Sequence, residues 1–269
     1  MPVTLGIANI GDIHFRDQSA LALYNELRTY CLDILDSNRE QLHLVNILGD
    51  LCHNKLHFGG VGAYYAATFI NDLLDILQGK PLRIIVGTRT HDYHQPLLFR
   101  HLQDRNVRVY DRPVVEVMEN LAPDQPRGFY ALYIPEEYPV DWREYYSQWL
   151  AEPEETYYDT IFMHGMMDYC SHSSQIAESE DSIPSSVVWP VKFLQERAVF
   201  TMAGHVHTPH IEGNTAYTGS FSRWCHGEEE DKGWRWLEYT LHDDGSSSYE
   251  IEHVKNKADP LYITVLSSE

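Results

Sequence analysis

The sequence predicts an α/β fold in which two packed sheets are flanked by helices, and three observations predict it. The first half alternates strand-like and helix-like segments, as parallel strands joined by helical crossovers do. The second half is a series of short apolar runs separated by turn residues, which is typical of strands. Several of the apolar runs end directly in Asp or His. A chain of 269 residues is also long enough to bury a large core.

In the first half, hydrophobic periodicity places the elements in alternating order. We expect strands at 3–11, 42–48, 82–87 and 106–110, and helices at 19–37, 59–78 and 96–103. Apolar side chains in the second helix recur at helical spacing and should face the core: Tyr65, Phe69, Leu73 and Leu77. Gly79 and Pro81 predict the end of that helix.

In the second half, strands are expected at 114–119, 129–134, 158–163, 199–203, 209–218, 233–241 and 249–254. Asp243, Asp244 and Gly245 predict a hairpin turn. The Ser-rich and acidic stretch 168–186 predicts a long exposed loop. We interpret 1–255 as one domain and 256–269 as a C-terminal tail that forms an edge strand or docks a partner.

The composition excludes some classes of function. The chain has 20 Lys and Arg against 40 Asp and Glu, which argues against a broad basic face for gripping nucleic acid. The acidic stretches 136–155 and 228–231 are interpreted as solvent-facing. No run approaches the ~20 apolar residues that a membrane span needs. The N-terminus lacks a signal-peptide pattern, and no Cys pair has CxxC spacing. A cytoplasmic location without membrane contact is therefore expected.

Metal-ligand residues end several of the strand-like runs. Asp12 and His14 are two residues apart, so in an extended segment both would point to one side. His205 and His207 in AGHVH have the same spacing. Carboxylates and imidazoles at such positions are the ligands that divalent transition metals prefer. Taken alone, Asp12 and His14 could instead be a strand-end turn with a surface histidine.

Three further runs are followed by candidate residues. Asp50 follows LVNILG and could bridge two cations through its two oxygens, although a helix cap is the alternative. His53 would reach over the same site, or be an ordinary loop histidine. His91 and Asp92 follow IIVGTRT, and His164 follows TIFM. A lone histidine such as His164 is more often structural. The case for His164 as a metal ligand therefore depends on the motifs in the other runs.

In order along the chain, the motifs DxH, GDxxH, a His-Asp pair, an isolated His and GHxH resemble those of the calcineurin-like metallophosphoesterase family. GDLCH and the later YTGSFSRW…EEEDKGW are similar to the SbcD-type DNA-repair exonucleases and their phage relatives. The resemblance implies a four-layer αββα sandwich of two mixed sheets flanked by helices. It also implies that 1–255 is a catalytic domain that cleaves DNA as an exonuclease or endonuclease subunit.

The resemblance implies a role for each matching residue. One ion would be held by Asp12, His14 and His207. The second ion would be held by His164 and His205, and Asp50 would bridge the two. His53 and His91 would contact the phosphate, and Asp92 would orient His91.

The sequence departs from the family where Gly-Asn-His is usual, because Thr90 precedes His91. Its hydroxyl is a weaker ligand than an amide oxygen, so the second ion is expected to bind loosely. Arg89 has no counterpart in the motif and would either clamp a phosphate or point to solvent. The resemblance further implies DNA and an SMC-like, SbcC-type ATPase as partners, with a homodimer as an alternative.

Two divalent ions are the implied cofactors. Oxygen and imidazole ligands favour Mn²⁺, and Fe²⁺, Zn²⁺ or Mg²⁺ would also fit. Metal-bound hydroxide would attack the phosphorus in line. Trp224 and Tyr93 could stack on unpaired bases, although core packing is the commoner fate of Trp. A small-molecule phosphodiesterase, a phosphoprotein phosphatase of the same family and a non-catalytic scaffold remain the alternative functions.

Overall fold

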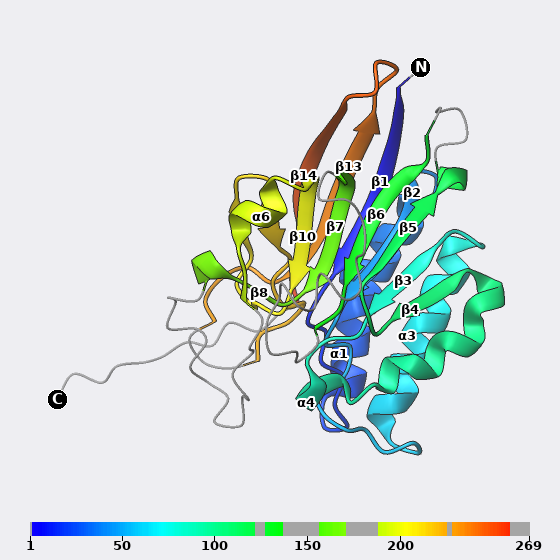
Figure 1. Cartoon of the computed structure of the whole chain (residues 1–269). Helices are drawn as coiled ribbons and strands as arrows, with labels where there is room; N and C mark the ends of the chain where they lie inside the picture. Colours follow the sequence, from blue (N-terminus) through cyan, green and yellow to red (C-terminus); the bar gives the residue numbers. More distant parts are fainter. Residues whose placement is uncertain (1, 122–126, 137–155, 171–187, 225–227, 259–269) are drawn as a thin grey trace.

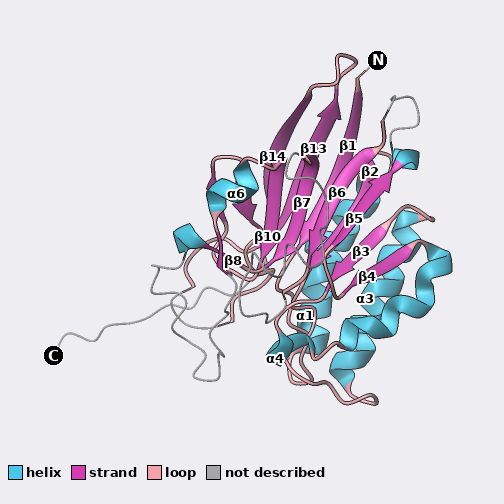
Figure 2. Ribbon diagram, viewed as in Figure 1, coloured by secondary structure: helices cyan, strands magenta, loops and turns pink. Residues whose placement is uncertain are grey.

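The computed structural model describes residues 2–121, 127–136, 156–170, 188–224 and 228–258. It contains two six-stranded mixed sheets with helices packed against them (Figures 1 and 2). This confirms the fold class that the sequence predicts.

The first sheet has the order β14-β13-β1-β2-β3-β4. Its parallel part consists of β1 (Val3–Ile10), β2 (Leu42–Leu48), β3 (Leu82–Ile85) and β4 (Val107–Tyr110). Two strands from the C-terminal part, β13 (Gly233–Leu241) and β14 (Ser247–Lys255), complete it on the other side of β1 in antiparallel pairing. The turn between them closes with a bond from the His242 N–H to the Ser246 carbonyl, as the hairpin prediction requires.

The crossover segments of the first sheet are helical, as predicted. Helix α1 (Ala20–Leu27) continues through a π-helical turn, Arg28–Leu32, into α2 (Asp33–Ser37). Helix α3 (Val61–Leu77) ends at Gln78, which takes the left-handed conformation with φ 50° just before Gly79. The segment expected as a helix at 96–103 is a 3₁₀ helix over Gln95–Arg105. The short helix α4 (Arg89–Asp92) is not anticipated by the periodicity.

The second sheet has the order β11-β12-β10-β7-β6-β5. Its parallel core is β6 (Phe129–Ile134), β7 (Tyr158–His164), β10 (Ala198–Gly204) and β12 (Thr215–Tyr217). The edge strands β5 (Val114–Met118) and β11 (His210–Glu212) run antiparallel to their neighbours. The single strand expected at 209–218 was wrong, because Gly213, with φ 59°, turns the chain back and divides it into β11 and β12.

Three short elements beside the second sheet are not predicted by the sequence. They are β8 (Met166–Met167), β9 (Val188–Trp189) and α6 (Val191–Gln195). Of the expected loop at 168–186, residues 168–170 form a 3₁₀ turn, and 171–186 lie outside the described residues. Most of the expected tail, residues 259–269, also lies outside them, so the division into 1–255 and 256–269 stays a prediction.

Apolar side chains form three layers that separate the sheets and helices. One layer lies between the first sheet and helices α1 and α3, and includes Ile47 and Phe69. A second lies between the two sheets and includes Leu48 and Phe162. A third covers the outer face of the second sheet, where Ile161 packs with Leu194 of α6. Neighbouring residues on a strand enter different layers because side chains alternate across a sheet. Within the described part of the chain, none of the helices has the length and apolar character needed to cross a membrane.

The parallel strands of both sheets direct their carboxyl ends to one edge of the sandwich (Figure 1), and six of them lead into the candidate site. They are β1, β2 and β3 of the first sheet and β6, β7 and β10 of the second. The loops that follow these strands meet there: Gly11 forms a bridge with Ser220, and the Phe221 N–H donates to the Asp12 carbonyl. This edge carries the candidate site, as in other open α/β sheets.

Candidate metal centre

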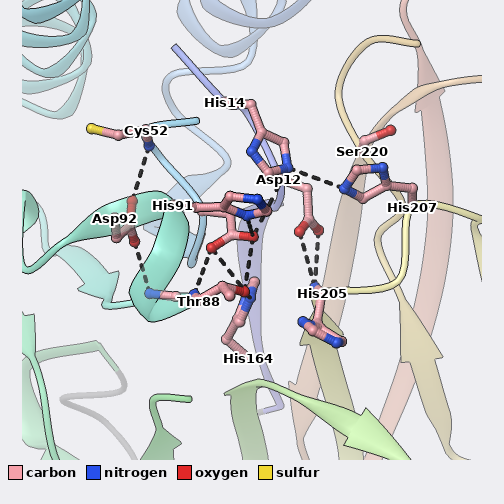
Figure 3. Close-up of polar contacts among 12 residues, drawn as sticks. Asp12, His14, Cys52, Thr88, His91, Asp92, His164, His205, His207 and Ser220 are labelled. Carbon is pink, nitrogen blue, oxygen red and sulfur yellow. Dashed lines mark hydrogen bonds and ion pairs between the residues drawn. The ribbon is translucent and has the colours of Figure 1, made fainter. Parts of the chain in front are cut away.

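The first group of ligand-type side chains consists of Asp12, His14 and His207, whose ligand atoms lie within 4.8 Å of one another. Asp12 and His14 follow β1 and are buried, and His207 follows β10. Nε2 of His14 lies 3.0 Å from Nε2 of His207 (Figure 3). Two ring nitrogens and a carboxylate oxygen therefore converge, which is a donor set that divalent transition metals accept.

Glu228 fixes the ring of His207. The Nδ1 atom of His207 lies 3.0 Å from Oε1 of Glu228, which leaves Nε2 free to face His14. Glu228 also accepts a hydrogen bond from the Trp224 N–H and lies 3.2 Å from Nζ of the buried Lys232. Burial alone would raise the pKa of Glu228, but the hydrogen bond from His207 and the charge of Lys232 lower it to about 2. Such a carboxylate behind a metal-ligating histidine sets the tautomer and orientation of the ring.

The second group consists of Glu136, His164 and His205. His164 is the last residue of β7, whereas Glu136 and His205 follow β6 and β10. Oε2 of Glu136 lies 3.3 Å from Nε2 of His164 and 3.2 Å from Nδ1 of His205. The Nδ1–H of His164 donates to the Leu48 carbonyl at 2.7 Å, so its Nε2 must face the centre. Both carboxylate and imidazole are again suited to a divalent ion.

Asp50 lies between the two groups. It is 2 % exposed and comes within 3.9 Å of Nε2 of His14 and 3.5 Å of Nε2 of His164. It accepts hydrogen bonds from the Thr88 N–H at 2.6 Å and from Nδ1 of His91 at 2.8 Å (Figure 3). Burial alone would raise the pKa of Asp50, but His164 and His91 hold it well below its ordinary value. Its position between the groups is that of a bridging ligand.

The backbone at these strand ends is strained. Asp12, His14, Asp50 and His205 have positive φ angles of 51°, 59°, 49° and 92°. Such angles are uncommon outside glycine and cluster at functional sites. Glycines allow the close packing around His164, since a Cβ at Gly49 would overlap its imidazole and a Cβ at Gly204 would overlap the Leu48 carbonyl.

His53 and His91 lie beside the first group, and a ring nitrogen of each lies within 4.8 Å of the other and of a ring nitrogen of His14. The ring of His91 is 4.8 Å from that of His14, and the ring of His53 is 5.4 Å from it. His53 stacks on Trp224 with ring centroids 5.2 Å apart, and Arg16 lies over the Trp224 ring. Burial, with the nearby charges of His91 and Arg16, lowers the pKa of His53 to about 4, so its ring is neutral near pH 7.

Asp92 does not orient His91 in the way that the resemblance implies. Its two carboxylate oxygens accept hydrogen bonds from the Cys52 N–H at 2.9 Å and the Gly87 N–H at 2.7 Å (Figure 3). Asp92 thus ties together the loops after β2 and β3, and Asp50 is the carboxylate that bonds to the His91 ring. Burial and the charge of Asp50 raise the pKa of Asp92 to about 7.

Thr88 takes the place in the site that the sequence interpretation gives to Thr90. The Thr88 hydroxyl lies 3.1 Å from Oδ2 of Asp50 and 2.9 Å from Oε2 of Glu136. Among the described residues, the polar contacts of the centre involve Thr88 and not Thr90. Arg89, on the first turn of α4, is exposed. The roles proposed for Thr90 and Arg89 therefore stay predictions.

Three residues of the centre are missed by the sequence interpretation: Thr88, Glu136 and Glu228. Glu136 and Glu228 fall in the two acidic stretches interpreted as solvent-facing, and for these two residues that interpretation was wrong. Residues 137–155 lie outside the described part of the chain. A signal for Glu136 exists, because it follows the apolar run FYALYI as the other ligands follow theirs. Glu228 begins the stretch EEEDKGW, which carries part of the family resemblance but was given no role in the site.

Charge supports a cation at this centre. Asp12, Asp50 and Glu136 are buried, and their described side-chain partners are histidines and Thr88 rather than Lys or Arg. Burying carboxylates costs free energy unless a positive charge compensates them. Burial alone would lower the pKa of His164, but Asp50 and Glu136 raise it well above its ordinary value. A divalent cation supplies the charge that these carboxylates need, so the residues fit a metal centre.

Comparisons with known proteins support the fold. No family model and no curated protein matches the sequence. Among solved structures, the alignment with GAP50, described as the anchor in the inner membrane complex of Plasmodium, covers 96% of this chain and 86% of that one. The identity is 13% and the TM-score 0.52.

Two bacterial structures match less well. A protein of Thermus thermophilus has a TM-score of 0.47 and 10% identity, over 92% of this chain and 99% of that one. A conserved protein of Streptococcus pneumoniae, described as a predicted phosphoesterase, has a TM-score of 0.36 and 12% identity, over 93% and 99%. These two superpose too loosely to carry an argument. At such identities the likeness concerns the fold alone, so the case for function rests on the residues of the centre.

Proposed function

We propose that this protein is a metal-dependent phosphodiesterase that cleaves DNA with a dinuclear metal centre. One observation carries the proposal: Asp50 lies between two carboxylate-histidine groups, within 3.9 Å of His14 in one and 3.5 Å of His164 in the other, at the edge where the parallel strands of both sheets end. Two divalent ions, when bound, activate water and neutralise the charge that develops on the phosphoryl oxygens. In the first group Asp12, His14 and His207 would hold an ion, and in the second His164 and His205 would.

The remaining residues of the centre would act on the substrate. His91 is half-buried beside His14, and its second ring nitrogen can donate to a phosphoryl or leaving oxygen. The neutral ring of His53 can donate a hydrogen bond to the phosphate. Trp224 is packed on His53, so we assign it to the wall of the site. Tyr93, which follows α4 and is 48% exposed, is the better candidate for stacking on an unpaired base.

The choice of DNA as substrate rests on the sequence resemblance to SbcD-type nucleases. The net charge of −20 gives little general affinity for DNA, which supports a requirement for an SMC-like ATPase or a second copy of the chain. The test is hydrolysis of single- and double-stranded DNA by the Mn²⁺-loaded protein, alone and with a candidate partner. Rapid hydrolysis of a small phosphoester without DNA cleavage under either condition would reject the choice of DNA.

Two alternative functions are separated by simple measurements. Faster turnover of p-nitrophenyl phosphate than of bis-p-nitrophenyl phosphate would indicate a phosphomonoesterase instead of a diesterase. The fold neighbour from Plasmodium is described as an anchor, so the fold alone does not decide in favour of catalysis. A purified protein that neither contains nor binds divalent ions would indicate a non-catalytic scaffold.

A further inference from the structure

Glu136 is a buried acidic residue at the interface of the two sheets. It follows Pro135 at the carboxyl end of β6, and its side chain is only 4% exposed. Its backbone N–H donates to the Val86 carbonyl at 3.3 Å, which joins the end of β6 in the second sheet to the chain after β3 in the first. The backbone of Glu136 is therefore anchored to both sheets at their interface, which fixes the point from which its side chain extends.

One oxygen of Glu136 meets three polar groups of the centre. Oε2 lies 3.3 Å from Nε2 of His164, 3.2 Å from Nδ1 of His205 and 2.9 Å from the Thr88 hydroxyl. Ligands held about 2.0–2.2 Å from a common ion lie roughly 3.0–3.5 Å from one another in tetrahedral or octahedral arrangements. Each of the two nitrogens therefore lies at the distance from this oxygen that is expected for two ligands of one ion, and all three atoms lie within 4.8 Å of one another.

The resemblance places Thr90, a weaker ligand, in the loop after β3 where an asparagine is usual. Glu136 reaches the same group from another strand of the other sheet. This part of the inference rests on the proposed dinuclear centre. We infer that Glu136 is a direct ligand of the second metal ion, together with His164, His205 and the shared Asp50, and that it replaces the missing amide ligand.

The replacement changes the chemistry of the second ion. A carboxylate brings a negative charge where an amide oxygen brings none, and it favours harder ions such as Mn²⁺ and Mg²⁺. The second ion should consequently bind firmly, which is the opposite of the loose binding expected from Thr90 alone. A structural ion pair between Glu136 and the histidines is the competing explanation, and metal binding distinguishes the two.

The experiment titrates Mn²⁺ into the metal-free full-length protein by calorimetry, with electron paramagnetic resonance to detect a coupled pair of ions. Wild type should bind two Mn²⁺ and show the coupled signal. Glu136→Gln should retain one Mn²⁺ with unchanged affinity, bind the second about tenfold or more weakly, and lose the coupled signal. Glu136→Asp keeps the charge on a shorter side chain and should fall between them.

The matched control is Glu116→Gln, which removes another buried glutamate that contacts Arg83 and lies outside the two ligand groups. It should bind two Mn²⁺ as wild type does. Circular dichroism of each variant confirms that it is folded. Two Mn²⁺ bound to Glu136→Gln with wild-type affinities would overturn the inference, as would fewer than two bound to wild type. Loss of one ion in Glu136→Gln, without phosphodiester hydrolysis by wild type, would overturn the proposed function and leave the ligand assignment in place.

Discussion

At the scale of single residues, the histidines of the centre are oriented by what their second nitrogen contacts. A carbonyl can only accept, so the bond to Leu48 fixes the proton of His164 on Nδ1 and directs Nε2 inward. Glu228 does the same for His207. These partners lie outside the ligand motifs, yet they decide which nitrogen faces an ion.

We expect Glu228→Gln to weaken binding of the ion held by His207 by about 10–100-fold, because the ring loses its charged partner. Mn²⁺ titration of the folded variant measures the effect. Glu252→Gln, at an exposed position on β14, is the control and should bind as wild type does. An unchanged affinity in Glu228→Gln would show that His207 needs no oriented partner.

Replacing His91 with Asn should lower the turnover of a phosphodiester by about 10²–10⁴-fold, the usual range for loss of a general acid or base. Both ions should remain bound, because His91 contacts Asp50 and the assigned ligands stay in place. Metal content and turnover are measured on the same preparation. If the variant loses an ion in proportion to its activity, His91 is itself a ligand.

The sequence was sufficient for residues that directly follow a strand, although Asp12, His14 and His205 have positive φ angles and not the extended backbone that the spacing argument assumes. Asp12 and His14, like His205 and His207, are two residues apart at a strand end, and the structure brings all four to one centre. Glu136 was missed because an acidic run follows it, and a buried carboxylate is not distinguishable from solvated ones by composition. Thr88 and Thr90 are equally plausible by sequence, since only the backbone path after β3 decides which hydroxyl faces Asp50.

At the scale of elements, a buried ionic cluster joins the edges of the two sheets. Glu116 on β5 accepts two hydrogen bonds from Arg83 on β3, at 2.8 and 2.7 Å, and a third from Arg108 on β4. The Tyr110 hydroxyl donates to the same carboxylate. Burial alone would raise the pKa of Glu116, but these partners, Arg83 above all, hold it below its ordinary value.

Glu116→Gln should lower the free energy of unfolding by about 3–5 kcal/mol at pH 7, because the buried guanidinium of Arg83 loses its counter-charge. Since the folded pKa of Glu116 lies below its unfolded value, its contribution is complete above about pH 4.5 and is lost as the pH falls further. The stability difference between variant and wild type should therefore shrink below pH 4.5.

Urea unfolding of the metal-free proteins at several pH values measures this difference. Glu119→Gln, at an exposed position three residues further on, should differ little from wild type at any pH. If the difference in free energy of unfolding between Glu116→Gln and wild type stays constant from pH 7 to acid pH, packing and not charge accounts for the destabilisation.

Elements were predictable where an apolar run had the length of one strand. The range 42–48 coincides with β2, and 129–134 coincides with β6. The prediction of one strand at 209–218 was wrong because Gly213 turns the chain there. The residues on either side of Gly213 are each compatible with a strand, so the sequence pattern does not reveal the turn. The two-residue strands β8 and β9 were not predictable, since they depend on pairing across a long sequence separation.

At the scale of the whole molecule, the centre draws ligands from both sheets. Asp12, His14 and Asp50 follow strands of the first sheet. His164 ends a strand of the second sheet, and Glu136, His205 and His207 follow strands of that sheet. Bound ions would therefore link the two sheets across their interface. An ion that binds only the folded state stabilises it according to its concentration relative to its Kd.

Mn²⁺ at about a thousand times its Kd should raise the free energy of unfolding by roughly 4 kcal/mol for each site. Thermal unfolding with Mn²⁺ and after treatment with EDTA measures the shift in Tm. Asp50→Asn should show a smaller shift than wild type, because both ions lose charge from their shared ligand. Equal Tm values for wild type with and without Mn²⁺ would contradict the metal centre.

The position of β1 has a consequence for the synthesis of the protein. This strand begins at Val3, yet one of its two neighbours is β13, which is not complete until Leu241. On a ribosome, the first strand must wait with one side unpaired until more than two hundred further residues have emerged. Because Asp12 and His14 follow that strand directly, their places in the candidate metal centre are fixed on both sides only after β13 has been synthesised.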